Sequence, residues 1–283
     1  MYWLPLALSF ACALLIAPIA LEALRASGLV RENYRGARVP TALGAVAAAG
    51  ALVALGPLAA LEELADADVF RTDAGRVLVY GLGIVLLGLL DDVLGGTLAG
   101  REGGDAPRGW RGHGEAAAAG RLTTGALKAL GALGLALYVM AGEGRTAGEY
   151  LLAVGVLVLA TNAFNLLDLR PGRALKALAL LGAGLTLGAL DVVPLQTLGI
   201  LVGALAALAP HDLLERGMLG DAGSNLAGGL AGFWLVLTLD TTGEAIALVA
   251  LVAVTVYGEF RSISALVEKS PLLRRLDSLG RRA

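Results

Sequence analysis

Four aspartates adjoin long apolar runs in this 283-residue chain. Asp91 and Asp92 follow one run, whereas Asp168 follows a second and Asp221 precedes a third. Magnesium in proteins is usually held by one or two carboxylates together with the phosphates of a substrate. Acids at several helix ends therefore indicate chemistry on a phosphate or diphosphate. For any single aspartate, a solvated helix end is an equally simple explanation.

The surroundings of Asp168 include two amide side chains. Asn162, Asn165 and Asp168 recur at a spacing of three, which places them on one stripe of a helix. Such a polar stripe at a helix end can bind a uracil, a ribose or a sugar. It can equally hydrogen-bond neighbouring membrane helices.

Asp221 lies in a glycine-rich segment, Gly220-Asp221-Ala222-Gly223-Ser224, directly before an apolar run. Glycines allow a ligand to approach the backbone closely, and the free amides of a helix start favour an anion such as phosphate. Aspartate is also a common N-cap residue, so capping is the alternative explanation.

Basic residues accompany these acids. Lys128 lies near the start of an apolar segment, where an ammonium group needs a partner. Arg173 begins another apolar segment, and Arg111 and His113 lie in the longest connection, 95–124, which is expected to be irregular. All except Lys128 are also explained by the general excess of positive charge on the cytosolic side of membrane proteins.

Composition places these residues in a membrane protein. Hydrophobic residues make up 57% of the chain and charged residues 16%, and the mean hydropathy is +0.75. These values exclude an ordinary soluble domain. A net charge of -2 provides no basic field, which argues against nucleic acid as a partner.

Runs without ionisable side chains predict an all-α, polytopic membrane helical bundle of about nine transmembrane helices. A span needs ~20 residues, so the shorter runs must extend into their flanks. Residues 1–260 form a single integral membrane domain in this interpretation, and 261–283 form a basic amphipathic tail at the membrane surface. The nine runs are 1–21, 39–61, 77–90, 129–142, 150–167, 177–190, 192–210, 222–239 and 245–258.

The distribution of positive charge predicts the orientation. If the connections after the odd-numbered runs are cytosolic, they and the adjoining helix ends hold all 22 Lys and Arg residues except Arg71, Arg76 and Arg145. The positive-inside rule then puts the N-terminus outside and the C-terminus in the cytosol. The four aspartates would share the cytosolic face.

Four segments resemble, in order, the motifs of the polyprenyl-phosphate N-acetylhexosamine-1-phosphate transferase superfamily, whose members are similar to phospho-N-acetylmuramoyl-pentapeptide transferase. Together they span most of the chain. The segments are 39–44 (VPTALG), 90–92 (LDD), 162–168 (NAFNLLD) and 219–224 (LGDAGS).

This resemblance implies a magnesium-dependent phosphoglycosyltransferase of the bacterial inner membrane with its active site facing the cytosol. It would transfer a sugar 1-phosphate from a UDP-sugar to undecaprenyl phosphate, releasing UMP, and so initiate cell-envelope glycan synthesis. The bilayer and a second copy of the chain in a homodimer are the other candidate partners. The implied site is catalytic Asp91, Asp92 and Lys128; substrate-binding Asn162, Asn165, Asp168, Arg173, Arg111 and His113; and metal-binding Asp221 and Asp92.

Three features depart from the family pattern. Pro171 stands where family members usually carry a second acid, the histidine-rich last cytosolic loop is absent, and no tenth apolar run follows. These departures favour a divergent branch whose sugar is undetermined. They also leave two alternatives, a catalytically degenerate scaffold and a transporter or flippase for lipid-linked sugars.

The predicted orientation can be tested directly. A reporter fused after Ala283 should be active only in the cytosol, because the basic connections fix the C-terminus on that side. Periplasmic activity of this fusion would show that a span is miscounted, and would distribute the four aspartates over two faces.

Overall fold

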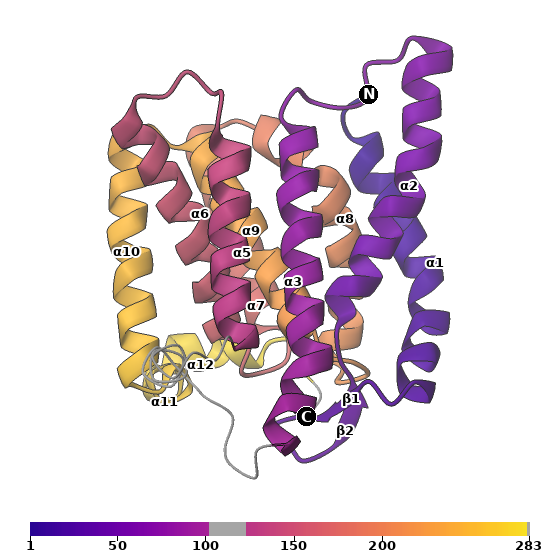
Figure 1. Ribbon diagram of the computed structural model, residues 1–283, viewed down its shortest axis with the longest axis vertical. Helices are drawn as coiled ribbons and strands as arrows, with labels where there is room; N and C mark the ends of the chain where they lie inside the picture. Colours follow the sequence, from indigo (N-terminus) through magenta and orange to yellow (C-terminus); the bar gives the residue numbers. More distant parts are fainter. Residues whose placement is uncertain (102–122, 282–283) are drawn as a thin grey trace.

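Long helices run back and forth through the computed structural model, which describes the backbone of residues 1–101 and 123–281 and the side chains of all these residues except 95–101 (Figure 1). Nine of the described helices are long, and two short ones close the chain. They are α1 Leu4–Ala26, α2 Leu43–Ala65, α3 Ala74–Arg101, α5 Thr124–Met140, α6 Ala147–Leu167, α7 Arg173–Ala189, α8 Val193–Leu213, α9 Gly220–Thr238, α10 Thr241–Phe260, α11 Ile263–Lys269 and α12 Pro271–Ser278.

Six described helices are long and apolar enough to cross a membrane: α1, α2, the Ala74–Leu94 part of α3, α6, α8 and α10. Helix α5 is apolar but shorter. Large apolar side chains such as Leu15 and Val249 point outward from α1 and α10, as expected for contact with lipid. The architecture is that of a polytopic helical membrane protein, while nine spans and their orientation remain predictions.

Two details of the predicted third helix are wrong. Helix α3 does not end at Asp91 and Asp92 but continues through them to Arg101. The predicted irregular connection 95–124 therefore begins as helix, and residues 102–122 lie outside the described part. An apolar run marks the part of a helix that suits lipid or core, whereas the backbone hydrogen bonds continue into polar sequence.

A short hairpin after α1 is an element that the apolar runs did not predict. Strand β1, Val30–Glu32, pairs antiparallel with β2, Arg38–Pro40. The turn is set by Asn33, whose Oδ1 accepts from the backbone N–H groups of Arg35 and Ala37, both at 2.9 Å. Helix α2 therefore starts at Leu43 and not at the beginning of the apolar run 39–61.

Helix α9 is the centre of the bundle and packs against α2, α3, α6, α7 and α8. All of its residues 222–236 are buried. Two glycines on neighbouring helices allow the first turn of α9 to be enclosed. A Cβ on Gly44 of α2 would lie 2.2 Å from the Ala222 carbonyl carbon, and a Cβ on Gly88 of α3 would lie 2.5 Å from the backbone carbonyl oxygen of Asp221. Only glycine permits this approach. Because Gly88 lies one turn before Asp91, it brings the acids of α3 to the start of α9.

Candidate active site

An ion cluster joins three helices at the end of the bundle. The Lys128 Nζ, on α5, lies 2.6 Å from Oδ2 of Asp221 on α9 and 3.2 Å from Oδ2 of Asp91 on α3. All three side chains are partly exposed, between 17% and 28%. Thr123 fixes the start of α5, since its side chain accepts from the Ala126 N–H at 3.1 Å. The structure thus brings together three residues that the sequence placed at separate helix ends.

Asn165 completes this cluster from α6. With its amide turned so that both polar atoms are satisfied, Asn165 Nδ2 donates to Asp221 Oδ1 at 3.0 Å and its oxygen accepts from Lys128 Nζ at 3.1 Å. The same nitrogen lies 3.1 Å from Ser224 Oγ. Ser224, which the sequence did not single out, donates in turn to the Gly220 carbonyl at 2.9 Å. These contacts fix the orientation of the carboxylate of Asp221.

Asp92 faces the backbone of α9. Its two carboxylate oxygens accept from the N–H groups of Asp221 and Ala222, each at 3.1 Å, and its side chain is buried. Gly220, at φ +65°, makes the turn that aims these amides at Asp92. Arg31 of the hairpin donates to the Asp92 carbonyl at 2.8 Å. Asp92 therefore caps α9 from a neighbouring helix and positions Asp221.

Asp168 follows α6 directly and is half-buried beside the cluster. Its carboxylate has no hydrogen bond or ion pair to another described residue. Burial raises the pKa of Asp168 well above its ordinary value, and the charges of Asp212 and Asp221 act in the same direction. Asp168 consequently holds its proton more firmly than a solvated aspartate does.

Asp212 is a buried acid that the sequence analysis missed. Its Oδ2 accepts from the N–H of Gly172 at 2.7 Å, and Gly172, at φ +71°, leads into α7. Asp212 thus fixes the connection that carries Arg173, the first residue of α7. The pair His211-Asp212 follows an apolar run, as Asp91-Asp92 does, and this similarity could have marked Asp212 as a site residue.

The structure does not bring the remaining predicted residues into the cluster. Asn162 Nδ2 donates to Thr255 of α10 at 3.5 Å, and Arg173 forms an ion pair with Asp277 in α12. Arg111 and His113 lie outside the described residues. The roles of Arg173, Arg111 and His113 in binding substrate remain predictions, whereas Asn162 faces α10 and not the cluster.

The donor set suits a magnesium ion that is shared with substrate phosphates. No group of three or more His, Cys, Asp or Glu side chains that could hold a metal exists among the described residues. Magnesium does not require such a group, because one or two carboxylates with phosphate oxygens suffice. Asp91 and Asp221 fit this requirement, since both reach the same ammonium group. The oxygens of Asp92 already accept two amides, and its predicted role as a ligand remains untested.

In comparisons with known proteins, no family model matches this chain and no curated protein matches it significantly. Function must therefore be inferred from the geometry of the site.

The capping role of Asp92 predicts a loss of stability. Asp92→Ala leaves two amides of α9 without their acceptor and should lower the free energy of unfolding by about 0.5–2 kcal/mol. A lower thermal midpoint in detergent would show this. Glu32→Ala, at an exposed position of β1, is the control and should stay within about 0.5 kcal/mol of the parent. Equal midpoints for both variants would contradict the capping role.

Proposed function

We propose that this chain is a membrane phosphoglycosyltransferase that transfers a sugar 1-phosphate from a UDP-sugar to a polyprenyl phosphate. The observation that carries the proposal is the convergence of Asp91, Lys128 and Asp221 at one end of a bundle of apolar helices. Two carboxylates and an ammonium at this position suit the joining of a lipid phosphate to a soluble diphosphate. The resemblance of the four motifs to the transferase superfamily supports the same proposal.

In the proposed reaction, an oxygen of the lipid phosphate attacks the β-phosphorus of the donor. A new P–O bond forms there, and the bond from the β-phosphorus to the bridging oxygen breaks, so that UMP leaves with that oxygen and the electron pair. Both reactants are anions, and such a transfer depends mainly on alignment and on neutralising charge. Magnesium, held by Asp91 and Asp221, would supply part of this neutralisation.

Lys128 is the residue of this chain that we assign to the reacting phosphates. Its ammonium group already lies between two carboxylates, and a phosphate oxygen can take the place of one of them. Asn165 orients both Lys128 and Asp221. Asp92 holds the start of α9, and so acts on the reaction through the position of Asp221.

The proposed reaction takes place at a membrane face. A polyprenyl chain is apolar and remains in the bilayer, so its phosphate must meet the enzyme at a membrane face. The cluster lies where α5 and α9 begin, and the charge asymmetry of the sequence favours the cytosolic face of a bacterial inner membrane. A soluble nucleotide sugar is available on that side.

The distribution of buried charge favours an enzyme over a transporter. Four charged residues are buried in the described part of the chain. Asp92, Arg173 and Asp212 lie towards the end of the bundle that carries the cluster, whereas Glu244 lies in the first turn of α10 and pairs with Arg145 at 2.9 Å. A path for a charged sugar phosphate across the bilayer would require charged groups between these two ends, and no buried charge lies between them in the described part of the chain.

A donor screen tests the proposed reaction and separates it from a scaffold role. Purified protein is incubated with undecaprenyl phosphate, magnesium and a panel of UDP-sugars, and UMP release is measured. We expect release with at least one donor, dependent on both the lipid and the metal. Absence of UMP release with every donor would contradict the proposal and favour a degenerate scaffold.

The two asparagines of α6 give a matched pair of variants for the donor pocket. Asn165→Ala should weaken UDP-sugar binding by about tenfold or more, because Asn165 orients Lys128 and Asp221. Asn162→Ala should bind donor like the parent, since Asn162 faces Thr255 of α10. Isothermal titration in detergent measures both affinities. Equal affinities in the two variants would place the donor pocket elsewhere.

A further inference from the structure

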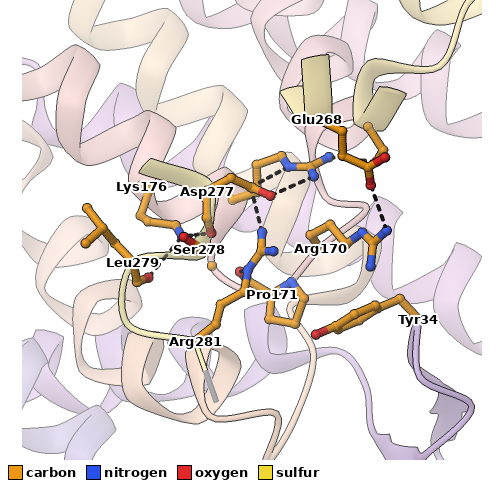
Figure 2. Close-up of polar contacts among 12 residues, drawn as sticks. Tyr34, Arg170, Pro171, Lys176, Glu268, Asp277, Ser278, Leu279 and Arg281 are labelled. Atoms are coloured by element: carbon orange, nitrogen blue, oxygen red, sulfur yellow. Dashed lines mark hydrogen bonds and ion pairs between the residues drawn. The ribbon is translucent and has the colours of Figure 1, made fainter. Parts of the chain in front are cut away.

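The C-terminal tail, residues 261–281, folds back against the connection between α6 and α7 (Figure 2). Ser262 and Ser270 cap its two short helices, accepting from the N–H groups of Ala265 at 3.2 Å and Leu273 at 3.4 Å. Asp277, near the end of α12, is the acid through which the tail meets the start of α7.

Asp277 is held by two arginines. Arg173 makes a two-pronged contact, with Nε 2.8 Å from Oδ1 and Nη2 3.1 Å from Oδ2. Arg281 Nη2 lies 2.6 Å from the same Oδ1, and Arg281 Nε donates to the Pro171 carbonyl at 2.9 Å. Although burial opposes them, these contacts hold the pKa of Asp277 below its ordinary value, so the carboxyl is ionised at neutral pH.

Lys176 adds a third cation at this position. Its ammonium group donates to the backbone carbonyls of Asp277 and Leu279, the latter at 3.1 Å, and contacts no carboxylate among the described residues. Figure 2 shows Lys176 and Arg281 close to Asp277. The nearby acid Asp212 is engaged by the Gly172 amide. Two guanidinium groups thus contact the Asp277 carboxylate, and the Lys176 ammonium group contacts the backbone beside it.

This arrangement requires an anion. The Arg173 side chain is only 8% exposed, and a buried charge without a partner is strongly destabilising. A planar guanidinium binds carboxylates and phosphates with the same two-pronged geometry. The position of Asp277 is therefore one that a phosphate group can also occupy.

Helix α12 is held mainly through polar contacts, whereas α11 also buries Ile263. No residue of α12 is buried, and Leu272 and Leu279 are exposed by 67% and 60%. A second ion pair, between Arg170 and Glu268, is 3.4 Å long and exposed to solvent. Because exposed ion pairs stabilise little and the Arg173–Asp277 pair is largely buried, the contacts of Asp277 are the main polar link between α12 and α7.

We propose that Arg173 and Lys176 at the start of α7 form an anion site that is occupied here by the chain's own Asp277 and is taken over by a diphosphate when the tail, with Asp277 and Arg281, is displaced. The site adjoins Asp212, because Asp212 fixes the turn that carries Arg173. The assignment of the diphosphate to a nucleotide sugar rests on the proposed function. The tail then acts as an internal competitor of the donor.

The test compares Asp277→Asn with the parent and with Glu268→Gln, which alters the other tail ion pair. Pyrophosphate binding to the full chain is measured by isothermal titration in detergent. Asp277→Asn should bind about tenfold more tightly, as expected when a competitor that occupies the site about nine tenths of the time is removed. Glu268→Gln should bind like the parent. Unchanged or weaker binding by Asp277→Asn would overturn the proposal.

Hydrogen exchange on the parent protein provides a second measurement that does not depend on the variant folding. Saturating pyrophosphate should increase amide exchange in 271–281, because the tail leaves its site. Unchanged exchange there would overturn the proposal. The two proposals can fail separately. If Asp277→Asn binds pyrophosphate more tightly but the donor screen shows no UMP release, the anion site is supported and only the proposed reaction is contradicted.

Discussion

The ammonium group of Lys128 is the constraint on which the site depends. A lysine near the start of an apolar helix is costly unless its charge is compensated, and here Asp91 and Asp221 compensate it at 3.2 and 2.6 Å. The three residues belong to α5, α3 and α9, so the contact fixes the relative positions of three helices. Removing the ammonium group would leave two neighbouring carboxylates without a counter-charge. The cluster therefore has a structural role in addition to the chemical role that we propose for it.

Close packing of the backbone makes this contact possible. Gly44 and Gly88 allow α2 and α3 to reach the first turn of α9, and Asp92 then caps that turn with both carboxylate oxygens. Of the two adjacent acids on α3, Asp92 accepts hydrogen bonds from the backbone of α9, and Asp91 contacts the ammonium group of Lys128. This division explains why a paired-acid motif on one helix can position a third acid on another.

Sequence reasoning predicted which side chains meet in the candidate site. Asp91, Lys128, Asn165 and Asp221 were found because ionisable and amide groups are conspicuous beside apolar runs, and the topology put those ends together. It could not predict the partner of Arg173, since Asp277 lies 104 residues away in a separate tail. Spacing also placed Asn162 on the same stripe as Asn165, but only packing decided that Asn162 turns to α10.

The central claim is that Asp221 is a charge-bearing group at reacting phosphates and not only a residue at a helix start. Asp221→Asn keeps the size of the side chain and removes its charge. UMP release by this variant and by the parent, measured across a magnesium titration with thermal stability in parallel, tests the claim most directly. We predict that turnover falls by about two orders of magnitude or more in a protein that remains folded. Turnover close to that of the parent would contradict the assignment of Asp221 and the case for catalysis at this cluster.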